Sequence, residues 1–250
     1  MSGLHEGRVA LVTGGDSGIG RGIVDELARE GAAVVIADVD PAAELAAGLP
    51  RALAVTMDVS DEEQVAAGFA RAREAFGTVD LLVNNAGIEM PHLLVDMPLG
   101  DWRKVLDVNL TGAFLCAREA ARGMLAANAK GVIVNVSSVH EVIPWPSFGH
   151  YCASKGGMKL FAQTIARELA PNGIRVVNVG PGAILTPINQ DLIDDAEKRK
   201  AVEDEIPLGR TGKPEEIAAT IAWVAGPEAD YITGTTIFVD GGMTLYPKFI

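Results

Sequence analysis

The sequence predicts an α/β fold in which helices cover both faces of a doubly wound, parallel sheet of about seven strands. Short runs of β-branched and apolar residues recur along the chain, and most of them are apolar on both sides of the pleat, as fully covered strands are. Longer segments with the helical spacing of apolar residues alternate with these runs, which is typical of βαβ units. The expected strands are residues 8–13, 33–38, 52–57, 80–85, 131–137, 174–179 and 236–240.

The composition narrows the class of protein. A chain of 250 residues with a hydrophobic fraction of 48% suits one domain over residues 1–250. The net charge of −12 argues against nucleic acid or an anionic membrane as a partner. Two cysteines are no disulfide framework, and neither a leader peptide nor an apolar run long enough to cross a membrane is visible. We therefore expect a cytoplasmic protein.

A glycine-rich run, TGGDSGIG at residues 13–20, joins the first expected strand to the first helix. Gly14 would allow a tight turn, Gly18 would let the backbone approach a pyrophosphate, and Gly20 would let the helix pack closely. The first helical turn would then offer free N–H groups to phosphates. Because the run lies between a strand and a helix, it favours a dinucleotide site over a glycine turn without a ligand.

The second expected strand ends in Asp38, eighteen residues after Gly20. A carboxylate at this place can accept hydrogen bonds from the adenosine ribose hydroxyls, and it would repel a 2′-phosphate. The glycine-rich run contains Asp16 and neither lysine nor arginine. Both features favour NAD over NADP as the cofactor. The alternative is that Asp38 only caps the end of its strand.

The segment HYCASKGGMKL, residues 150–160, places Tyr151 and Lys155 four residues apart and therefore on one helix face. A nearby ammonium favours the anionic form of a phenol and lowers its pKa. A tyrosine with such a neighbour can exchange a proton during catalysis. The lysine could also hold a ribose hydroxyl. The pair alone is too common to be specific, so its meaning depends on the residues around it.

Polar side chains follow other strands. Ser138 follows the fifth expected strand, and ligands of parallel sheets bind at the carboxyl ends of strands, so its hydroxyl could position a substrate oxygen. Asn84 ends the fourth strand, and Asn109 lies in a long helical segment after it. Buried asparagines need partners, so each indicates a structural contact or a site. The structural interpretation is favoured for Asn84, and the two are balanced for Asn109.

The most irregular region lies between the sixth strand and the last helix, at about residues 184–213. We expect a loop that shapes the substrate pocket, because long insertions of this kind usually bind ligands. Its charge run, DDAEKRK, is typical of a solvated helix face. The helix expected at residues 214–225 begins with proline and two acids, as helix N-termini often do.

Together these motifs resemble the classical branch of the short-chain dehydrogenase/reductase family. The resemblance implies a Rossmann-type three-layer fold with a seven-stranded sheet, a nicotinamide cofactor and no metal. It also implies four catalytic residues. Tyr151 would donate or accept the proton, and Lys155 would hold the nicotinamide ribose. Ser138 would orient the substrate oxygen, and Asn109 would hold a water in a proton relay. The matching elements are TGGDSGIG, Asp58, NNAG, Asn109, Ser138, YCASK and PGAILT.

The residues expected at the cofactor are Gly14, Asp16, Ser17, Gly18, Ile19, Gly20, Asp38, Asp58, Val59, Asn85, Ala86, Gly87, Tyr151, Lys155, Pro181, Gly182, Ile184 and Thr186. Within the family the chain is most similar to the bacterial glucose 1-dehydrogenases, in GIEMP (87–91), NLTGAFLCAREA (109–120), SSVHEVIPWPSFGHYCASKGGMKL (137–160), GPGAILTPIN (180–189) and DGGMTLYPKF (240–249). This similarity implies a sugar or polyol substrate.

Glu89 and His140 each follow a strand of the expected site, and both can hydrogen-bond the hydroxyls of such a substrate, together with Ser138 and Tyr151. The alternatives are a solvated loop acid for Glu89 and a structural histidine for His140. Trp145 lies between two prolines, and packing is favoured over stacking on a sugar. The glucose enzymes accept both NAD and NADP. The acid Asp38 at the end of the second strand departs from their pattern, and it puts the use of both cofactors in doubt.

Two other functions compete with a sugar dehydrogenase. A 3-oxoacyl thioester reductase would need NADPH and a basic surface for an acidic carrier protein, against which Asp38, Asp16 and the net charge argue. A dinucleotide-binding protein without catalysis would not need all four catalytic residues. The resemblance further implies a homotetramer that associates through helices 99–126 and 149–170 and the C-terminal tail.

Overall fold

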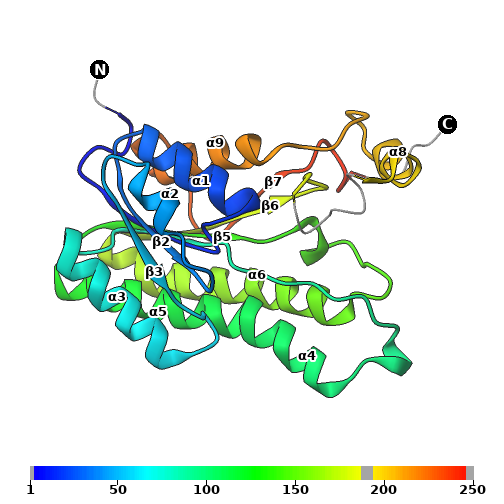
Figure 1. The fold of residues 1–250 in the computed structure, drawn as a ribbon, viewed down its shortest axis with the longest axis horizontal. Helices are drawn as coiled ribbons and strands as arrows, with labels where there is room; N and C mark the ends of the chain where they lie inside the picture. The colour runs from blue at the N-terminus through cyan, green and yellow to red at the C-terminus, as the bar shows by residue number, and fades with distance from the viewer. Residues whose placement is uncertain (1–2, 187–193, 246–250) are drawn as a thin grey trace.

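Seven parallel strands form the predicted sheet in the computed structural model, which describes residues 3–186 and 194–245 (Figure 1). Their order across the sheet is β3-β2-β1-β4-β5-β6-β7, so the winding reverses between β1 and β4. Every predicted strand is confirmed to within two residues at each end. The strands are β1 (Val9–Thr13), β2 (Ala33–Asp38), β3 (Ala52–Thr56), β4 (Leu81–Asn84), β5 (Gly131–Val136), β6 (Ile174–Pro181) and β7 (Thr236–Val239).

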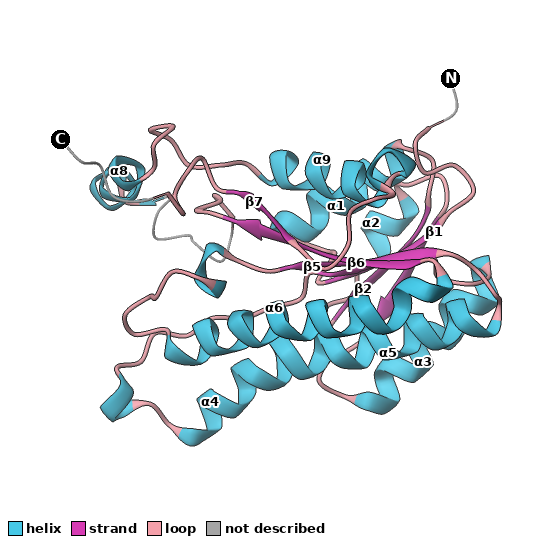
Figure 2. Cartoon of the chain, turned by 180° about the vertical axis from the view of Figure 1, so that it is seen from behind, coloured by secondary structure: helices cyan, strands magenta, loops and turns pink. Residues whose placement is uncertain are grey.

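Helices cover both faces of this sheet (Figures 1 and 2). α1, α2 and α9 lie on one face, and α3, α5 and α6 lie on the other, so the doubly wound three-layer prediction is confirmed. The helices are α1 (Gly18–Arg29), α2 (Ala43–Ala47), α3 (Glu62–Phe76), α4 (Leu99–Leu106), α5 (Gly112–Ala126), α6 (Gly149–Leu169), α8 (Ala196–Glu205) and α9 (Pro214–Ala225). Shorter turns are η1 (Leu94–Asp96), η2 (Asp107–Thr111), η3 (Val139–Glu141), η4 (Ala170–Asn172) and η6 (Pro227–Ala229).

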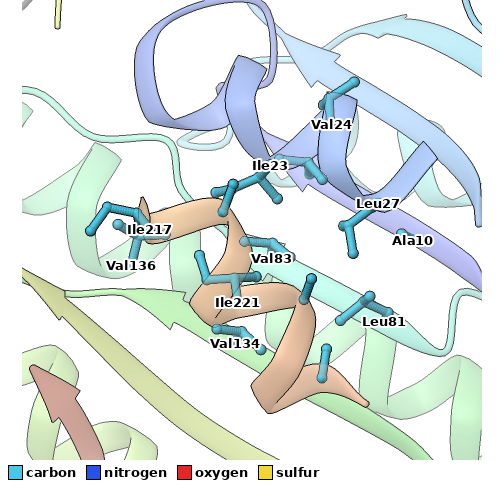
Figure 3. Close-up of a cluster of buried hydrophobic side chains, with 14 of the residues drawn as sticks. Ala10, Ile23, Val24, Leu27, Leu81, Val83, Val134, Val136, Ile217 and Ile221 are labelled. Carbon is cyan, nitrogen blue, oxygen red and sulfur yellow. The ribbon is translucent and has the colours of Figure 1, made fainter. Parts of the chain in front are cut away.

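The apolar core is divided into two clusters by the sheet. Alternate residues of one strand point to opposite faces, so Ala10 of β1 packs towards α1 and α9, whereas Leu11 packs towards α3 and α5. Because both faces are covered, neither set of positions is polar, and the strands read as continuous apolar runs. Burial of each large aliphatic side chain contributes about 1.5–3 kcal/mol. Figure 3 shows the first cluster, where α1 and α9 contribute Ile23, Val24, Leu27, Ile217 and Ile221.

The region between β6 and α9 contains α8, which has no buried residue and carries the charge run, as expected of a solvated helix face. Residues 187–193 of the predicted loop lie outside the described residues. α9 has the bounds predicted for the last helix, with Pro214 in its first turn. Within residues 3–186 and 194–245, no helix is long and apolar enough to cross a membrane.

Candidate active site

A cavity of about 870 Å³ lies at the carboxyl ends of the strands. Its wall is drawn from the turns after β1, β2, β4, β5 and β6 and from α6, and it includes the place between β1 and β4 where the winding reverses. Such switch points are where doubly wound sheets bind ligands, and the volume suits a large small-molecule ligand. The predicted site residues on the wall are Gly14, Ser17, Gly18, Ile19, Asp38, Asp58, Val59, Asn85, Ala86, Gly87, Glu89, Ser138, His140, Tyr151, Lys155, Pro181, Gly182, Ile184 and Thr186.

Three predicted residues do not lie on the wall: Asp16, Gly20 and Asn109. Gly20 faces the carbonyl oxygen of Gly14, and a Cβ atom added to it would lie 1.9 Å from that oxygen. Its hydrogen side chain therefore allows α1 to close against the turn, and its contribution is packing rather than contact with a ligand. The backbone N–H of Asp16 donates to Asp38 Oδ2 at 3.0 Å, so Asp16 lies beside a residue of the wall without being part of the wall.

The start of α1 fits a phosphate group. Gly14 and Gly18 have φ angles of +62° and +52°, a region that glycine adopts without strain. The N-cap residue Ser17 makes no side-chain cap, and the first turn of α1 contains no acid. The leading N–H groups of the helix are therefore left for an anion, with the positive end of the helix dipole behind them.

The side chain of Asn85, the residue after β4, and the hydroxyl of Thr13 on β1 hold the glycine-rich turn in place. The Asn85 amide donates to the carbonyl oxygens of Thr13 and Gly14, each at 2.9 Å. In return, the Thr13 hydroxyl accepts from the backbone N–H groups of Asn85 and Ala86, each at 3.0 Å. These four bonds join the ends of two neighbouring strands, so the glycine-rich turn and the NNAG turn form one rigid edge of the cavity.

Asp38 lies at the end of β2 and on the cavity wall. One carboxylate oxygen accepts from the Asp16 N–H, and the other accepts from the Asp40 N–H at 3.3 Å. It therefore does cap local backbone, as the alternative interpretation held, and it also faces the cavity. β2 and the turn after it contribute Asp38 and Val39 to the wall and no cation, so this part of the cavity is acidic.

Tyr151, Ser138 and Lys155 converge on the opposite part of the wall. A hydrogen bond joins the side chains of Tyr151 and Ser138. The Lys155 ammonium is buried, donates to the Val136 carbonyl at 2.8 Å, and lies 5.6 Å from the centre of the Tyr151 ring. α6 supplies the tyrosine and lysine, and the corner after β5 supplies the serine. Tyr151 and Lys155 were expected to share a helix face, and in the structure they meet Ser138. A substrate oxygen at this point could contact both the tyrosine phenol and the serine hydroxyl.

Burial controls the acid–base character of this pair. It raises the pKa of the Tyr151 phenol, an effect that the Ser138 hydrogen bond partly offsets and the Glu89 carboxylate increases. It lowers the pKa of Lys155 to about 8, while Glu89 and Glu141 act in the opposite direction. The expected lowering of the tyrosine pKa by the ammonium is not found: removal of the phenol from water disfavours its anion and raises the pKa, and Lys155 is not among the groups that lower it.

Asn109 sits behind the wall in a π turn, η2, which interrupts the long helical segment expected after β4. Its Oδ1 accepts from the Ile88 N–H at 2.8 Å, and its Nδ2 donates to the Ile88 carbonyl at 2.9 Å and to Ser154 Oγ at 3.2 Å. Ser154 in turn donates to the Tyr151 carbonyl at 2.7 Å. The buried asparagine therefore connects the turn after β4 with the helix that carries Tyr151. π turns of this kind are often found at functional sites.

Beneath the cavity, three buried asparagines form an amide ladder across β4, β5 and β6. Asn84 Nδ2 donates to Asn135 Oδ1, and Asn135 Nδ2 donates to Asn178 Oδ1, both at 2.9 Å. The residues are direct neighbours in the strand register. Asn84 therefore has the structural role that its sequence position favoured. The ladder fixes the strand ends from which the site residues project.

Aromatic rings occupy the part of the wall next to Tyr151. His140 stacks on Trp145, with ring centres 4.5 Å apart and planes within 13°, and Trp145 stacks on Phe148 at 3.7 Å. His140 Nδ1 donates to the Ile143 carbonyl at 3.1 Å, and burial lowers its pKa, so the ring is neutral at pH 7. Both His140 and Trp145 thus have packing partners and face the cavity. Glu89 completes this side of the wall.

Motif reasoning missed several residues of the wall. Some of them, such as Val136 and Ser137, lie beside a predicted residue in the sequence, so the motif that marks that residue could also have found them. Lys104 on α4, Val202 and Glu205 on α8 and Met243 after β7 reach the cavity only through the fold, and no local pattern marks them. The full set of missed residues is Val39, Met57, Ile88, Lys104, Val108, Val136, Ser137, Val139, Ile143, Pro144, Pro146, Ala183, Val202, Glu205 and Met243.

Comparison with known proteins extends over nearly the whole chain. The sequence family described as enoyl-(acyl carrier protein) reductase matches residues 14–244. The chain is 45% identical to 3beta-hydroxysteroid dehydrogenase 1 of Eggerthella lenta, covering 98% of this chain and 96% of that protein. It is 43% identical to glucose 1-dehydrogenase 2 of Bacillus subtilis, covering 97% and 96%. Its structure is similar to that of a short-chain type dehydrogenase/reductase from Mycobacterium marinum, with a TM-score of 0.92, 35% identity and 97% of each chain covered.

Proposed function

Because the chain belongs to the short-chain dehydrogenase/reductase family and is an NAD(P)-dependent dehydrogenase of CH–OH groups, we propose that it oxidises a sugar or polyol with NAD. The observation that carries the substrate class is the polar pair beside the reacting groups. Glu89 and His140 both lie on the wall next to Tyr151 and Ser138. A substrate with several hydroxyls needs such partners around the one that reacts.

In this proposal Tyr151 exchanges a proton with the substrate oxygen, and Ser138 binds that oxygen in line with the phenol. A nicotinamide cofactor held here would supply the hydride donor or acceptor for the substrate carbon. Lys155 holds the nicotinamide ribose and keeps positive charge near the phenol. Asn109 positions Tyr151 through Ser154 and holds the turn at Ile88. The hydrogen bond between Tyr151 and Ser138 supports this assignment, because it places both hydroxyls at one point.

The cofactor residues of the proposal are those that fit a dinucleotide in shape and charge. The start of α1 takes the pyrophosphate, and Asp38 takes the adenosine ribose. The acidic wall at β2 supports NAD rather than NADP, since a 2′-phosphate there would meet a carboxylate and no cation. Asp58 and Val59 would hold the adenine, the NNAG turn would hold the middle of the cofactor, and Pro181, Gly182, Ile184 and Thr186 would hold the nicotinamide end; all of these residues except Asn84 lie on the cavity wall.

A 3-hydroxysteroid is the second candidate substrate, and it too has a specific observation in its favour. The wall beyond Tyr151 contains an apolar run, Ile143 to Pro146. A fused-ring alcohol would bury more of this surface than a sugar would. The 45% identical relative named for such a substrate is consistent with this arrangement.

Turnover on a substrate panel distinguishes the two. We would measure the reduction of NAD and NADP with aldoses, polyols and 3-hydroxysteroids. The same panel is run on the wild-type protein and on the Glu89→Gln variant. A sugar dehydrogenase should oxidise an aldose or polyol, and the Glu89 variant should raise its KM about tenfold or more, because one charge-assisted hydrogen bond is lost. Turnover of steroids alone, unchanged in the variant, would contradict the sugar assignment.

We also propose a homotetramer. The outer surface of the layer formed by α4, α5 and α6 carries apolar side chains, with Leu160 65% exposed and Phe114 40% exposed and in edge contact with Phe161. α5 and α6 lie side by side in this layer (Figure 2). A flat pair of helices with exposed apolar residues suits a symmetric contact with a second copy. The last residues of the tail expected to contribute, 246–250, lie outside the described residues.

A further inference from the structure

Directly behind the proposed catalytic groups lies a carboxylate that touches neither the cavity nor the solvent. Glu141 ends η3, three residues after Ser138, and its side chain is 0% exposed. One of its oxygens, Oε2, accepts from the Ser137 hydroxyl at 2.6 Å. The other, Oε1, accepts no hydrogen bond from the residues that the structure describes. Glu141 is also absent from the cavity wall, to which Ser137 and Ser138 both belong.

The unbonded oxygen faces positive charge. Lys159 Nζ lies 3.6 Å from Glu141 Oε1, on the turn of α6 that follows Lys155. Lys159 is 35% exposed, whereas Lys155 is buried, so the two lysines differ in how much water screens them. A fully buried carboxylate is costly unless charged partners compensate for its lost hydration. Lys159 supplies part of that compensation. Lys155, one helical turn earlier, donates to the carbonyl of Val136, the residue next to the Ser137 that bonds Glu141.

We propose that Glu141 is a positioning residue for the reaction: its buried carboxylate, bonded to Ser137, fixes the corner of β5 that presents Ser138 and stabilises the ammonium of Lys155, which the same corner holds through the Val136 carbonyl. The inference rests on the role proposed above for Lys155. It differs from the roles of Tyr151, Ser138 and Lys155, because those three residues lie on the cavity wall and Glu141 does not. Its bond to Ser137 restrains the corner, and its charge acts on the lysine through the protein interior.

The charges around Lys155 show why a buried anion matters here. Burial lowers the pKa of Lys155 to about 8, and the two groups that raise it are Glu89, across the cavity, and Glu141. On α6 itself, Lys159 is a like charge and Tyr151 is a neutral phenol at pH 7, and His140 on η3 is also neutral. Loss of the Glu141 charge would remove one of the two anions that raise the pKa of Lys155, so Lys155 would release its proton at lower pH.

Two variants that break the same ion pair from opposite ends separate this role from a merely structural one. Glu141→Gln removes the negative charge, and its amide oxygen can still accept from Ser137. Lys159→Met removes the positive charge and leaves the carboxylate beside Lys155. A structural ion pair would give the same change in both variants. The proposal gives opposite changes, because Lys155 loses an attractive charge in the first variant and a repulsive one in the second.

The measurement is the pKa of Lys155, by NMR titration of protein labelled with ¹³C-lysine, with Lys155→Met assigning the signal. The pH dependence of the NADH dissociation constant is measured in parallel. We expect Glu141→Gln to lower the Lys155 pKa by about one unit, as loss of a nearby charge in the protein interior does, and to weaken NADH binding about tenfold at pH 8. Lys159→Met should leave this pKa unchanged or raise it.

A Lys155 pKa that is unchanged in Glu141→Gln, or that falls in both variants, would overturn the proposal. If Glu141→Gln does not fold, Lys159→Met alone still decides, since a fall in the Lys155 pKa contradicts the proposal, and an unchanged or raised pKa is the result that it expects. The lysine titration needs no substrate or cofactor. Failure of the wild-type protein to bind NADH or to turn over any alcohol would therefore count against the proposed function, and not against the link between Glu141 and Lys155.

Discussion

At the scale of single residues, Tyr151 is constrained on several sides. Its hydroxyl bonds Ser138, and its ring meets His140 and Trp145 edge-on, with ring centres 6.2 and 6.0 Å apart. Burial raises its pKa, so the phenol carries its proton at neutral pH. A protonated phenol bonded to a hydroxyl is prepared to donate to a carbonyl oxygen, which is the step that reduction requires.

Tyr151→Phe removes the proton and keeps the ring. We expect kcat to fall by about 10²-fold or more, because general acid–base catalysis is lost. The NADH dissociation constant should change little, and fluorescence titration of NADH checks this on the same preparation. Near-normal turnover in the variant would remove Tyr151 from the mechanism.

Lys155 gives a prediction about pH. Its pKa is lowered to about 8, and the charged form is the one that can hold a ribose and stabilise a phenolate. The rate of carbonyl reduction should therefore be constant below this value and decline as the pH rises through it, since the ammonium loses its proton. A profile of kcat/KM from pH 6 to 10 tests this sign. A rate that stays level to pH 10 would show that Lys155 remains charged or is not required.

At the scale of elements, the strand ends depend on the amide ladder of Asn84, Asn135 and Asn178. Asn135→Leu keeps the branched shape of the side chain, adds some volume and leaves the Asn178 oxygen without its donor in a buried place. We expect the free energy of unfolding to fall by about 1–3 kcal/mol, the usual cost of one unsatisfied buried polar group. Urea denaturation measures it, with Val134→Leu on the same strand as a control for volume alone. An equal loss in both variants would show that the ladder contributes nothing specific.

The strands and the glycine-rich turn could be predicted because local chemistry marks them. A strand covered on both faces, such as β1 with Ala10 and Leu11, must be apolar at every position, and glycine must occupy the turn at Gly14. The π turn at Asn109 could not be predicted, because one extra residue per turn hardly alters the apolar spacing of a helix. The side-chain bonds of the ladder needed the strand register, which no local pattern contains.

At the scale of the whole molecule, the cavity is assembled from segments far apart in the chain. Glycines after β1, the corner after β5, α8 and Met243 after β7 all reach its wall. The motifs located the first two. The contributions of α8 and Met243 depend on the tertiary fold of the region after β6. Local sequence motifs therefore contain little information about the substrate.

The exposed layer of α5 and α6 leads to a prediction about assembly. Leu160→Asp introduces a charge at the centre of the proposed contact and should convert the tetramer to smaller species. Light scattering coupled to gel filtration measures the mass of both proteins. Leu208→Asp, at an exposed leucine outside this layer, is the matched control and should remain tetrameric. A monomeric wild-type protein would refute the assembly.

The most direct test of the account is the cofactor preference of the wild-type protein, compared with that of Asp38→Ala carrying Val39→Arg. Asp38 should favour NAD, because it can accept from the ribose hydroxyls and meets a 2′-phosphate with like charge. We expect kcat/KM with NAD to exceed that with NADP by about 10²-fold or more in the wild type, as the loss of charge-assisted bonds implies. The double variant should reduce or reverse this ratio. Equal use of both cofactors by the wild type would show that Asp38 serves only the backbone groups of Asp16 and Asp40, and would contradict the proposed site.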